Sequence, residues 1–90
     1  MRYQIICTTR KENNSIDKLG FVEDGAYTEK HKYLEDKEAI NERIQKGDSF
    51  FFTDEGDVKV DVIAVEDAYV KTSPDGTKKN NLLHLKRCPL

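Results

Sequence analysis

The sequence predicts an α+β fold: a mostly antiparallel sheet of about four to six strands with one amphipathic helix packed on one face. Three observations support it. Apolar residues alternate near both ends, one central segment has helical spacing, and turn residues separate the later strands. Runs of hairpins favour antiparallel pairing. With 90 residues, the chain has room for one core, so we expect a single small domain over residues 1–90.

The first part of the chain predicts two strands. Residues 2–9 alternate, with Tyr3, Ile5 and Cys7 on one face, and the polar run 10–15 ends the pattern. Residues 16–22 predict a second, short strand. The charged residues 23–32 predict an exposed connection.

Residues 35–46 predict the helix. Ile40 and Ile44 lie at helical spacing, Asp36 can cap the first turn, and Gly47 follows the last one.

The second half predicts consecutive strands. Residues 49–53 and 58–65 flank an acidic turn at 54–57, residues 68–72 and 82–85 predict two further strands, and residues 73–76 predict a type I turn. The expected core comprises Ile5, Leu19, Ile40, Ile44, Phe50, Phe52, Val60, Val62, Val70, Leu83 and Leu85.

Charge is distributed unevenly around a net −2. Residues 23–67 carry −8, whereas residues 68–90 carry +4. An acidic middle is not typical of nucleic-acid-binding domains, which are strongly basic. The alternative is a local basic patch that would contact the phosphates of a nucleic acid. It would be formed by Lys71, Lys78, Lys79, Lys86 and Arg87.

The chain predicts a cytoplasmic protein without membrane attachment. No segment approaches the roughly 20 apolar residues of a membrane span, and the start lacks the layout of a secretory signal. Cys7 and Cys88 are therefore expected to be reduced, partly buried thiols that act as small hydrophobes; a disulfide between them is plausible only in an oxidising compartment.

The sequence gives little support for a metal site or for a catalytic cysteine. A zinc site would need Cys7, Cys88, His31 and His84 to converge, and their spacing fits no common zinc motif. Cys88 and His84, four apart on a strand, would lie well over ~10 Å apart, too far for a nucleophile and its base.

The remaining polar motifs indicate structure rather than chemistry. The acidic turn 54–57 lacks calcium-loop spacing, and Asn80 and Asn81 are expected to bond backbone groups. Common nucleotide and hydrolase motifs are missing. We therefore expect a protein that is not an enzyme and needs no cofactor.

The apolar run at residues 50–52 suggests an interaction surface. In a strand Phe51 points opposite to its neighbours, so it is expected to join Ile63 and Val65 on the outer sheet face. This face would bind a protein partner or form a homodimer. The structural alternative is a second small cluster under the connection at 23–34.

The chain resembles a family of small bacterial and phage proteins, domain of unknown function 3892. The resemblance is carried by residues 3–7, by Ala39, Ile40, Ile44 and Gly47, and above all by residues 69–72, 75–76, 80–83 and 85–88. Such proteins typically carry proline and a variable residue before the last cysteine, and here Lys86-Arg87-Cys88-Pro89 departs from that pattern. The family implies no activity, cofactor or catalytic residue.

Two functional hypotheses follow. The first is a non-enzymatic protein-interaction module or homodimer that uses the outer face around Phe51. The second is a small accessory nucleic-acid-binding protein that uses the basic C-terminal segment, with Tyr69 stacking on bases.

Overall fold

The computed structural model describes residues 1–13, 15–26, 30–53, 59–66, 69–72, 82 and 85–89. Along the chain the elements are β1 (Arg2–Arg10), β2 (Ile16–Glu23), β3 (Tyr33–Asp36), α1 (Lys37–Gln45), β4 (Ser49–Thr53), β5 (Lys59–Val65) and β6 (Tyr69–Thr72). Several predictions concern residues outside these ranges: the turns at 54–57 and 73–76, and Lys78, Lys79, Asn80, Asn81, Leu83 and His84.

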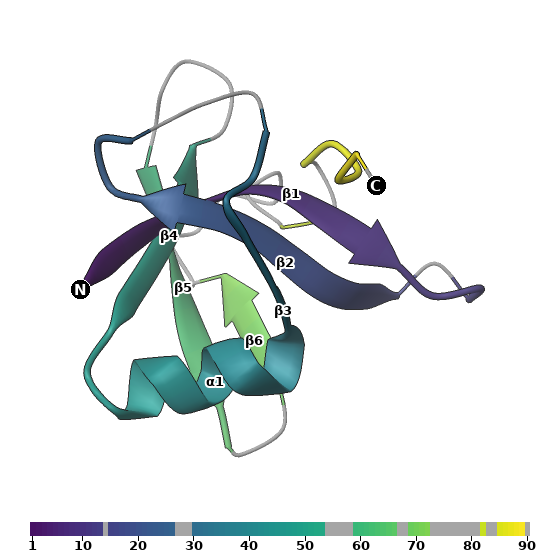
Figure 1. Cartoon of the computed structure of the whole chain (residues 1–90). Helices are drawn as coiled ribbons and strands as arrows, with labels where there is room; N and C mark the ends of the chain where they lie inside the picture. Colours follow the sequence, from purple (N-terminus) through teal and green to yellow (C-terminus); the bar gives the residue numbers. More distant parts are fainter. Residues whose placement is uncertain are drawn as a thin grey trace.

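The strands form one six-stranded sheet in the order β3-β2-β1-β4-β5-β6 (Figure 1). All neighbours are antiparallel except β1 and β4, where Arg2–Gln4 run parallel to Ser49–Phe51. Parallel neighbours need a long crossover connection, which β2, β3 and α1 supply here. The predicted α+β class, with one helix and a mostly antiparallel sheet, is confirmed.

Strand β3 lies where the sequence predicted a connection and the start of the helix. Tyr33 and Leu34 pair with Phe21 and Gly20 of β2. Helix α1 therefore begins at Lys37 rather than Glu35. Asp36 occupies the N-cap position without a side-chain capping hydrogen bond. At the other end Gly47 has φ 110°, the left-handed conformation for which glycine suits a helix end.

Helix α1 packs against the sheet over a mixed aliphatic and aromatic core (Figure 1). Every predicted core residue within the described ranges is buried in this cluster or packs against it. Its buried members are Tyr3, Ile5, Leu19, Phe21, Ile40, Phe50, Phe52, Val60, Val62 and Leu82.

A second, smaller cluster contains Ile6, Cys7, Val22 and Cys88, with Leu34 packed against it. Alternate strand residues point to opposite faces, so Val22 joins this cluster while Phe21 joins the main core. This cluster is not the one suggested by the sequence alternative, because it contains none of Phe51, Ile63 and Val65.

The C-terminal end differs from the prediction of a strand at 82–85. Leu82 lies in a 3₁₀ turn and Leu85 in a bend. Both leucines nevertheless contact the main core. Among the residues that the structure describes, no helix has the length and apolarity to span a membrane.

Candidate functional site at the C-terminal tail

The C-terminal tail, residues 85–89, is held against the middle of the sheet by backbone hydrogen bonds to Thr8. The Thr8 amide donates to the Lys86 carbonyl and the Cys88 amide donates to the Thr8 carbonyl, each at 2.9 Å. This is the pattern of a parallel β-bridge between Thr8 and Arg87. Because β4 pairs only with Arg2–Gln4 of β1, the tail extends the pairing of β1 beyond the reach of β4.

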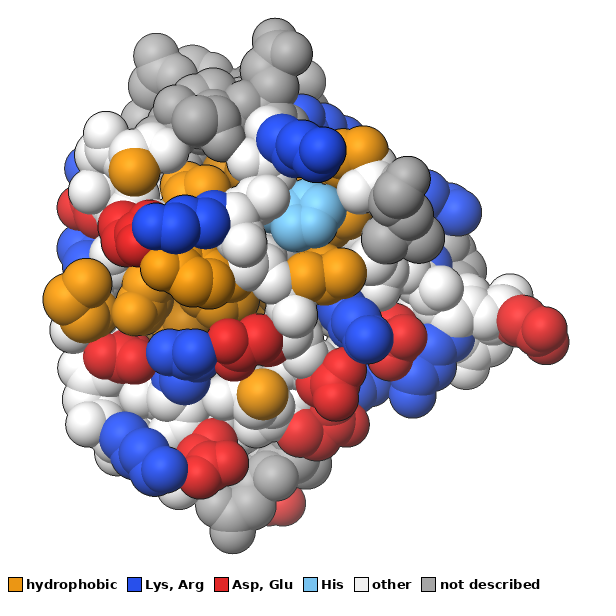
Figure 2. Space-filling view, in the orientation of Figure 1, with side chains coloured by type: hydrophobic (Ala, Val, Ile, Leu, Met, Phe, Trp, Pro, Cys, Tyr) orange, Lys and Arg blue, Asp and Glu red, His pale blue; other side chains and the backbone are white. Residues whose placement is uncertain are grey.

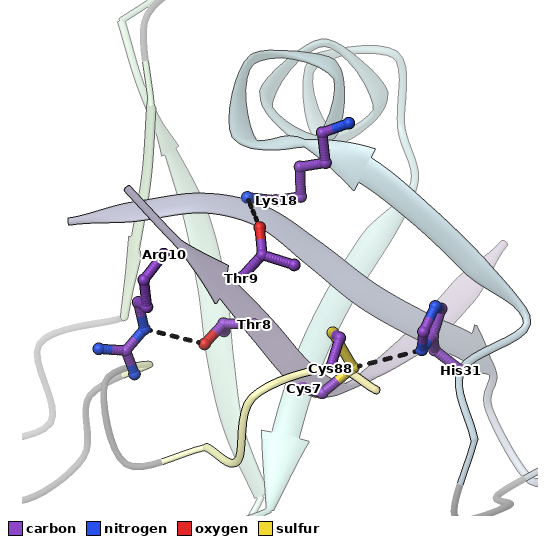
Figure 3. Close-up of a disulfide and its surroundings, with 7 residues drawn as sticks. All are labelled: Cys7, Thr8, Thr9, Arg10, Lys18, His31 and Cys88. Atoms are coloured by element: carbon purple, nitrogen blue, oxygen red, sulfur yellow. Dashed lines mark hydrogen bonds between the residues drawn. A yellow bond between two sulfur atoms is a disulfide. The ribbon is translucent and has the colours of Figure 1, made fainter. Parts of the chain in front are cut away.

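Cys7 and Cys88 form a disulfide that fixes the tail covalently (Figure 3). Their Cα atoms are 4.9 Å apart although the residues are separated by 81 positions in the sequence. The expectation of two separate reduced thiols is therefore wrong for this structure. Pairing of the tail beside Thr8 places Cys88 next to Cys7, and this contact depends on the fold.

His31 lies beside the disulfide, with its Nδ1 3.7 Å from the Sγ of Cys7 (Figure 3). A disulfide sulfur carries no proton, so in this contact only the imidazole can donate. The next residue along the chain, Lys32, donates its backbone amide to the Phe21 carbonyl at 3.3 Å, which holds this segment beside β2. His31 is half-buried, and the pale blue imidazole reaches the surface in Figure 2.

Gly20 supplies the space that these three side chains occupy. It pairs with Cys7 across β1 and β2. A Cβ atom at this position would lie within 3.0 Å of both sulfur atoms and of the Cβ of His31. Any larger residue would displace the disulfide or the imidazole.

The Sγ atoms of Cys7 and Cys88 and a ring nitrogen of His31 all lie within 4.8 Å of one another. Three of the four residues considered for zinc from the sequence therefore converge, and His84 lies outside the described residues. The arrangement allows two kinds of chemistry: thiol–disulfide exchange when oxidised, and soft-metal coordination when reduced.

The predicted outer apolar face around Phe51 is not exposed. Phe51 is only 1% exposed. The Arg2 guanidinium lies 4.4 Å and the Lys59 ammonium 5.1 Å from its ring centroid. Ile63 and Val65 are partly buried on β5. Phe51 is therefore buried rather than exposed as predicted. An interaction role for the face around Ile63 and Val65 stays a prediction.

The predicted basic patch is divided between two regions. Lys71 is exposed on the edge strand β6, whereas Lys86 and Arg87 are exposed on the tail beside β1. In the sheet, β6 is separated from β1 by β4 and β5. Lys78 and Lys79 lie outside the described ranges.

His31 was a candidate metal ligand from the sequence, whereas the role of Gly20 in the site was not predicted. The available signal was a glycine in the middle of a predicted strand, which often marks close approach of another group. What the sequence could not show was which group approaches, because Cys7, His31 and Cys88 come from three distant segments.

Neither the comparison with curated proteins nor the comparison with solved structures gave a match to this chain. One family model does match, over residues 4–86, and it is described as "Protein of unknown function (DUF3892)". Because this match spans nearly the whole sheet and the helix, the chain belongs to the DUF3892 family.

Proposed function

We propose that the protein is a non-enzymatic interaction module whose binding edge is β1 at Thr8. The C-terminal tail covers that edge. The Cys7–Cys88 disulfide holds the tail on β1 when oxidised and allows it to dissociate when reduced. The observation that carries the proposal is the combination of strand-like pairing between Thr8 and Arg87 with a disulfide between their chain neighbours, Cys7 and Cys88.

The physical basis is the cost of an unpaired strand edge. Thr8 is fully buried, and its amide and carbonyl both bond the tail. When the tail leaves, these two groups lose their partners. An extended segment of another protein restores them by adding a strand in the same place.

The tail itself indicates what such a segment must carry. Leu85 packs against the main core and Cys88 belongs to the second cluster, so apolar side chains are needed on both sides of the backbone pairing. The partner is therefore an extended peptide with apolar residues three apart. A cytoplasmic location fits this proposal, because thiols there stay reduced until an oxidant acts.

A fluorescent peptide with the sequence of residues 85–90, with alanine in place of the cysteine to keep that position apolar, tests the open edge. We expect it to bind the full-length Cys88→Ser variant and not the oxidised wild type, as measured by fluorescence anisotropy. The matched control is Pro89→Ser, which changes an exposed neighbour and retains the disulfide.

Binding of the peptide to neither Cys88→Ser nor the oxidised wild type, or to both equally, would contradict the proposal. Light scattering of Cys88→Ser at increasing protein concentration distinguishes the two kinds of partner that could pair with the open edge. Dimer formation identifies a second copy of this chain as the partner, whereas a monomer that binds the peptide indicates a different protein.

The nucleic-acid alternative is favoured by one observation. Arg10 lies two residues beyond Thr8, and Lys86 and Arg87 are exposed on the strand segment that pairs there. Short single-stranded DNA should then bind with an affinity that falls steeply between about 50 and 200 mM salt, and Lys86→Glu should weaken it. Binding that is insensitive to salt and to this substitution would exclude the role.

A further inference from the structure

We propose that the reduced protein binds one zinc ion through the Sγ atoms of Cys7 and Cys88 and the Nδ1 of His31. In tetrahedral zinc sites, bond lengths of about 2.3 Å to sulfur and about 2.0 Å to nitrogen place a sulfur and a nitrogen ligand about 3.5 Å apart. The Cys7 Sγ and His31 Nδ1 are already 3.7 Å apart. The Cys88 Sγ lies within 4.8 Å of the other two ligand atoms. To reach tetrahedral positions, the two sulfur atoms must separate to about 3.8 Å, which breaking their bond permits.

In the disulfide-bonded structure the three ligand side chains already lie together. Cys7 is fixed within β1, Cys88 by the backbone pairing of the tail with Thr8, and His31 by the segment that pairs with β2. The absence of a side chain at Gly20 leaves room beside all three. Holding the ligands in place lowers the ordering cost of binding.

The donor set favours zinc over magnesium or calcium. Thiolate and imidazole are soft or borderline ligands, whereas magnesium and calcium prefer oxygen. Two cysteines, one histidine and a water molecule form a known four-coordinate zinc set. Both cysteines are buried and His31 is half-buried, so the water is expected on the side of the imidazole.

Reduction of the disulfide and binding of the metal are two separate steps, and electrons and protons balance in each. A dithiol reductant transfers two electrons and two protons to the Cys7–Cys88 bond, giving two thiols while the reductant becomes a disulfide. Zinc then binds the two sulfur atoms as thiolates, and both thiol protons pass to solvent. Zinc and the disulfide therefore exclude each other, and either one holds the tail on β1.

This inference does not depend on the proposed binding edge. Zinc can bind even if no peptide ever displaces the tail from β1. Conversely, the peptide can bind Cys88→Ser, which lacks a complete zinc site. The two experiments therefore fail separately.

The test begins with metal-free wild type reduced by a phosphine, which does not supply a competing thiol. Cobalt(II) is titrated as a spectroscopic probe and then displaced by zinc. We expect thiolate-to-cobalt absorption that saturates at one ion per chain, and no such absorption from the oxidised protein. A reduced protein without this absorption, or an oxidised protein that binds equally well, would overturn the proposal.

The role of His31 is tested by substitution. His31→Ala should weaken zinc at least about ten-fold, since even loss of a group that only orients a ligand has an effect of this size. His31→Cys should restore most of the affinity by supplying a third thiolate. The control, Lys32→Ala, changes an exposed neighbour and should leave affinity unchanged.

Circular dichroism of each reduced variant establishes that it is folded before titration. Equal zinc affinity in folded His31→Ala and wild type would remove His31 from the site. Failure of His31→Cys to restore binding would do the same.

Discussion

At the scale of single residues, a glycine and a histidine determine what surrounds the disulfide. Gly20 is buried in β2 and faces Cys7, Cys88 and His31, so the absence of a side chain there allows three segments to meet. This requirement comes from space and not from backbone conformation.

Gly20→Ala is expected to lower the free energy of unfolding by about 1 to 3 kcal/mol, because overpacking forces the neighbouring side chains to shift. Urea unfolding followed by circular dichroism measures the loss. Lys18→Ala, an exposed change on the same strand, is the control and should have little effect. A Gly20→Ala protein as stable as wild type would show that the cluster has spare room.

Glu23 gives the fold a predicted sensitivity to acid. Hydrogen bonds from the Tyr33 hydroxyl and then from the Lys32 ammonium lower the pKa of Glu23 from 4.5 to about 2. Because the folded pKa lies below the unfolded one, the unfolded state binds more protons in this window. The stabilisation is complete above about pH 4.5 and is lost as pH falls towards 2.

Thermal unfolding midpoints of wild type should therefore fall more steeply than those of Glu23→Gln between about pH 5 and about pH 2.5. Asp17→Asn, on the same strand, is a control for removal of a charge. Parallel pH profiles for wild type and Glu23→Gln would contradict the assignment.

At the scale of elements, α1 does more than cover the core. Asn41 is 1% exposed, and its side-chain amide donates to the carbonyls of Val65 and Glu66 at 3.4 and 3.1 Å. Gln45 donates to the Glu66 carbonyl at 2.9 Å. Glu66 has φ 53°, an unfavourable value for a residue with a side chain, so the helix supports a strained position at the end of β5.

Asn41→Ala should destabilise the protein by about 1 to 3 kcal/mol, since it removes a buried side-chain amide and its hydrogen bonds to the carbonyls at the end of β5. The control substitution Glu42→Ala, one residue along the helix, should change the free energy of unfolding little, because its ion pair with Lys46 is exposed to solvent. Similar losses in the two variants by urea unfolding would show that the Asn41 contact contributes little.

At the scale of the whole molecule, the disulfide joins positions near the two ends of the chain. Its sequence separation of 81 closes most of the protein into a loop. A small domain with one modest core benefits strongly from such a restriction of its unfolded state.

Cys88→Ser should lower the free energy of unfolding by about 2 to 5 kcal/mol relative to the oxidised wild type; the loop-entropy estimate gives about 4.5 kcal/mol. Denaturant unfolding in the absence of metal gives the difference. Cys7→Ser provides a second measurement of the same bond. A loss below about 1 kcal/mol in both would show that the disulfide adds little to the backbone pairing at Thr8.

The α+β class, the helix around Ile40 and Ile44, and seven of the ten buried residues of the main core could be predicted from the sequence. These follow from local periodicity, which records which side chains face inward. Strand β3 was not predicted, because four residues of mixed polarity acquire strand structure only by pairing with β2.

The candidate site and the burial of Phe51 depend on contacts between distant segments, which the sequence pattern does not reveal. Cys7, Gly20, His31 and Cys88 have no recognisable spacing, and they meet because β2 and the tail flank β1 on opposite sides. Phe51 was expected on an exposed face, yet Arg2 and Lys59 cover it from neighbouring strands. Periodicity tells which way a side chain points, but contacts between distant segments determine what it meets.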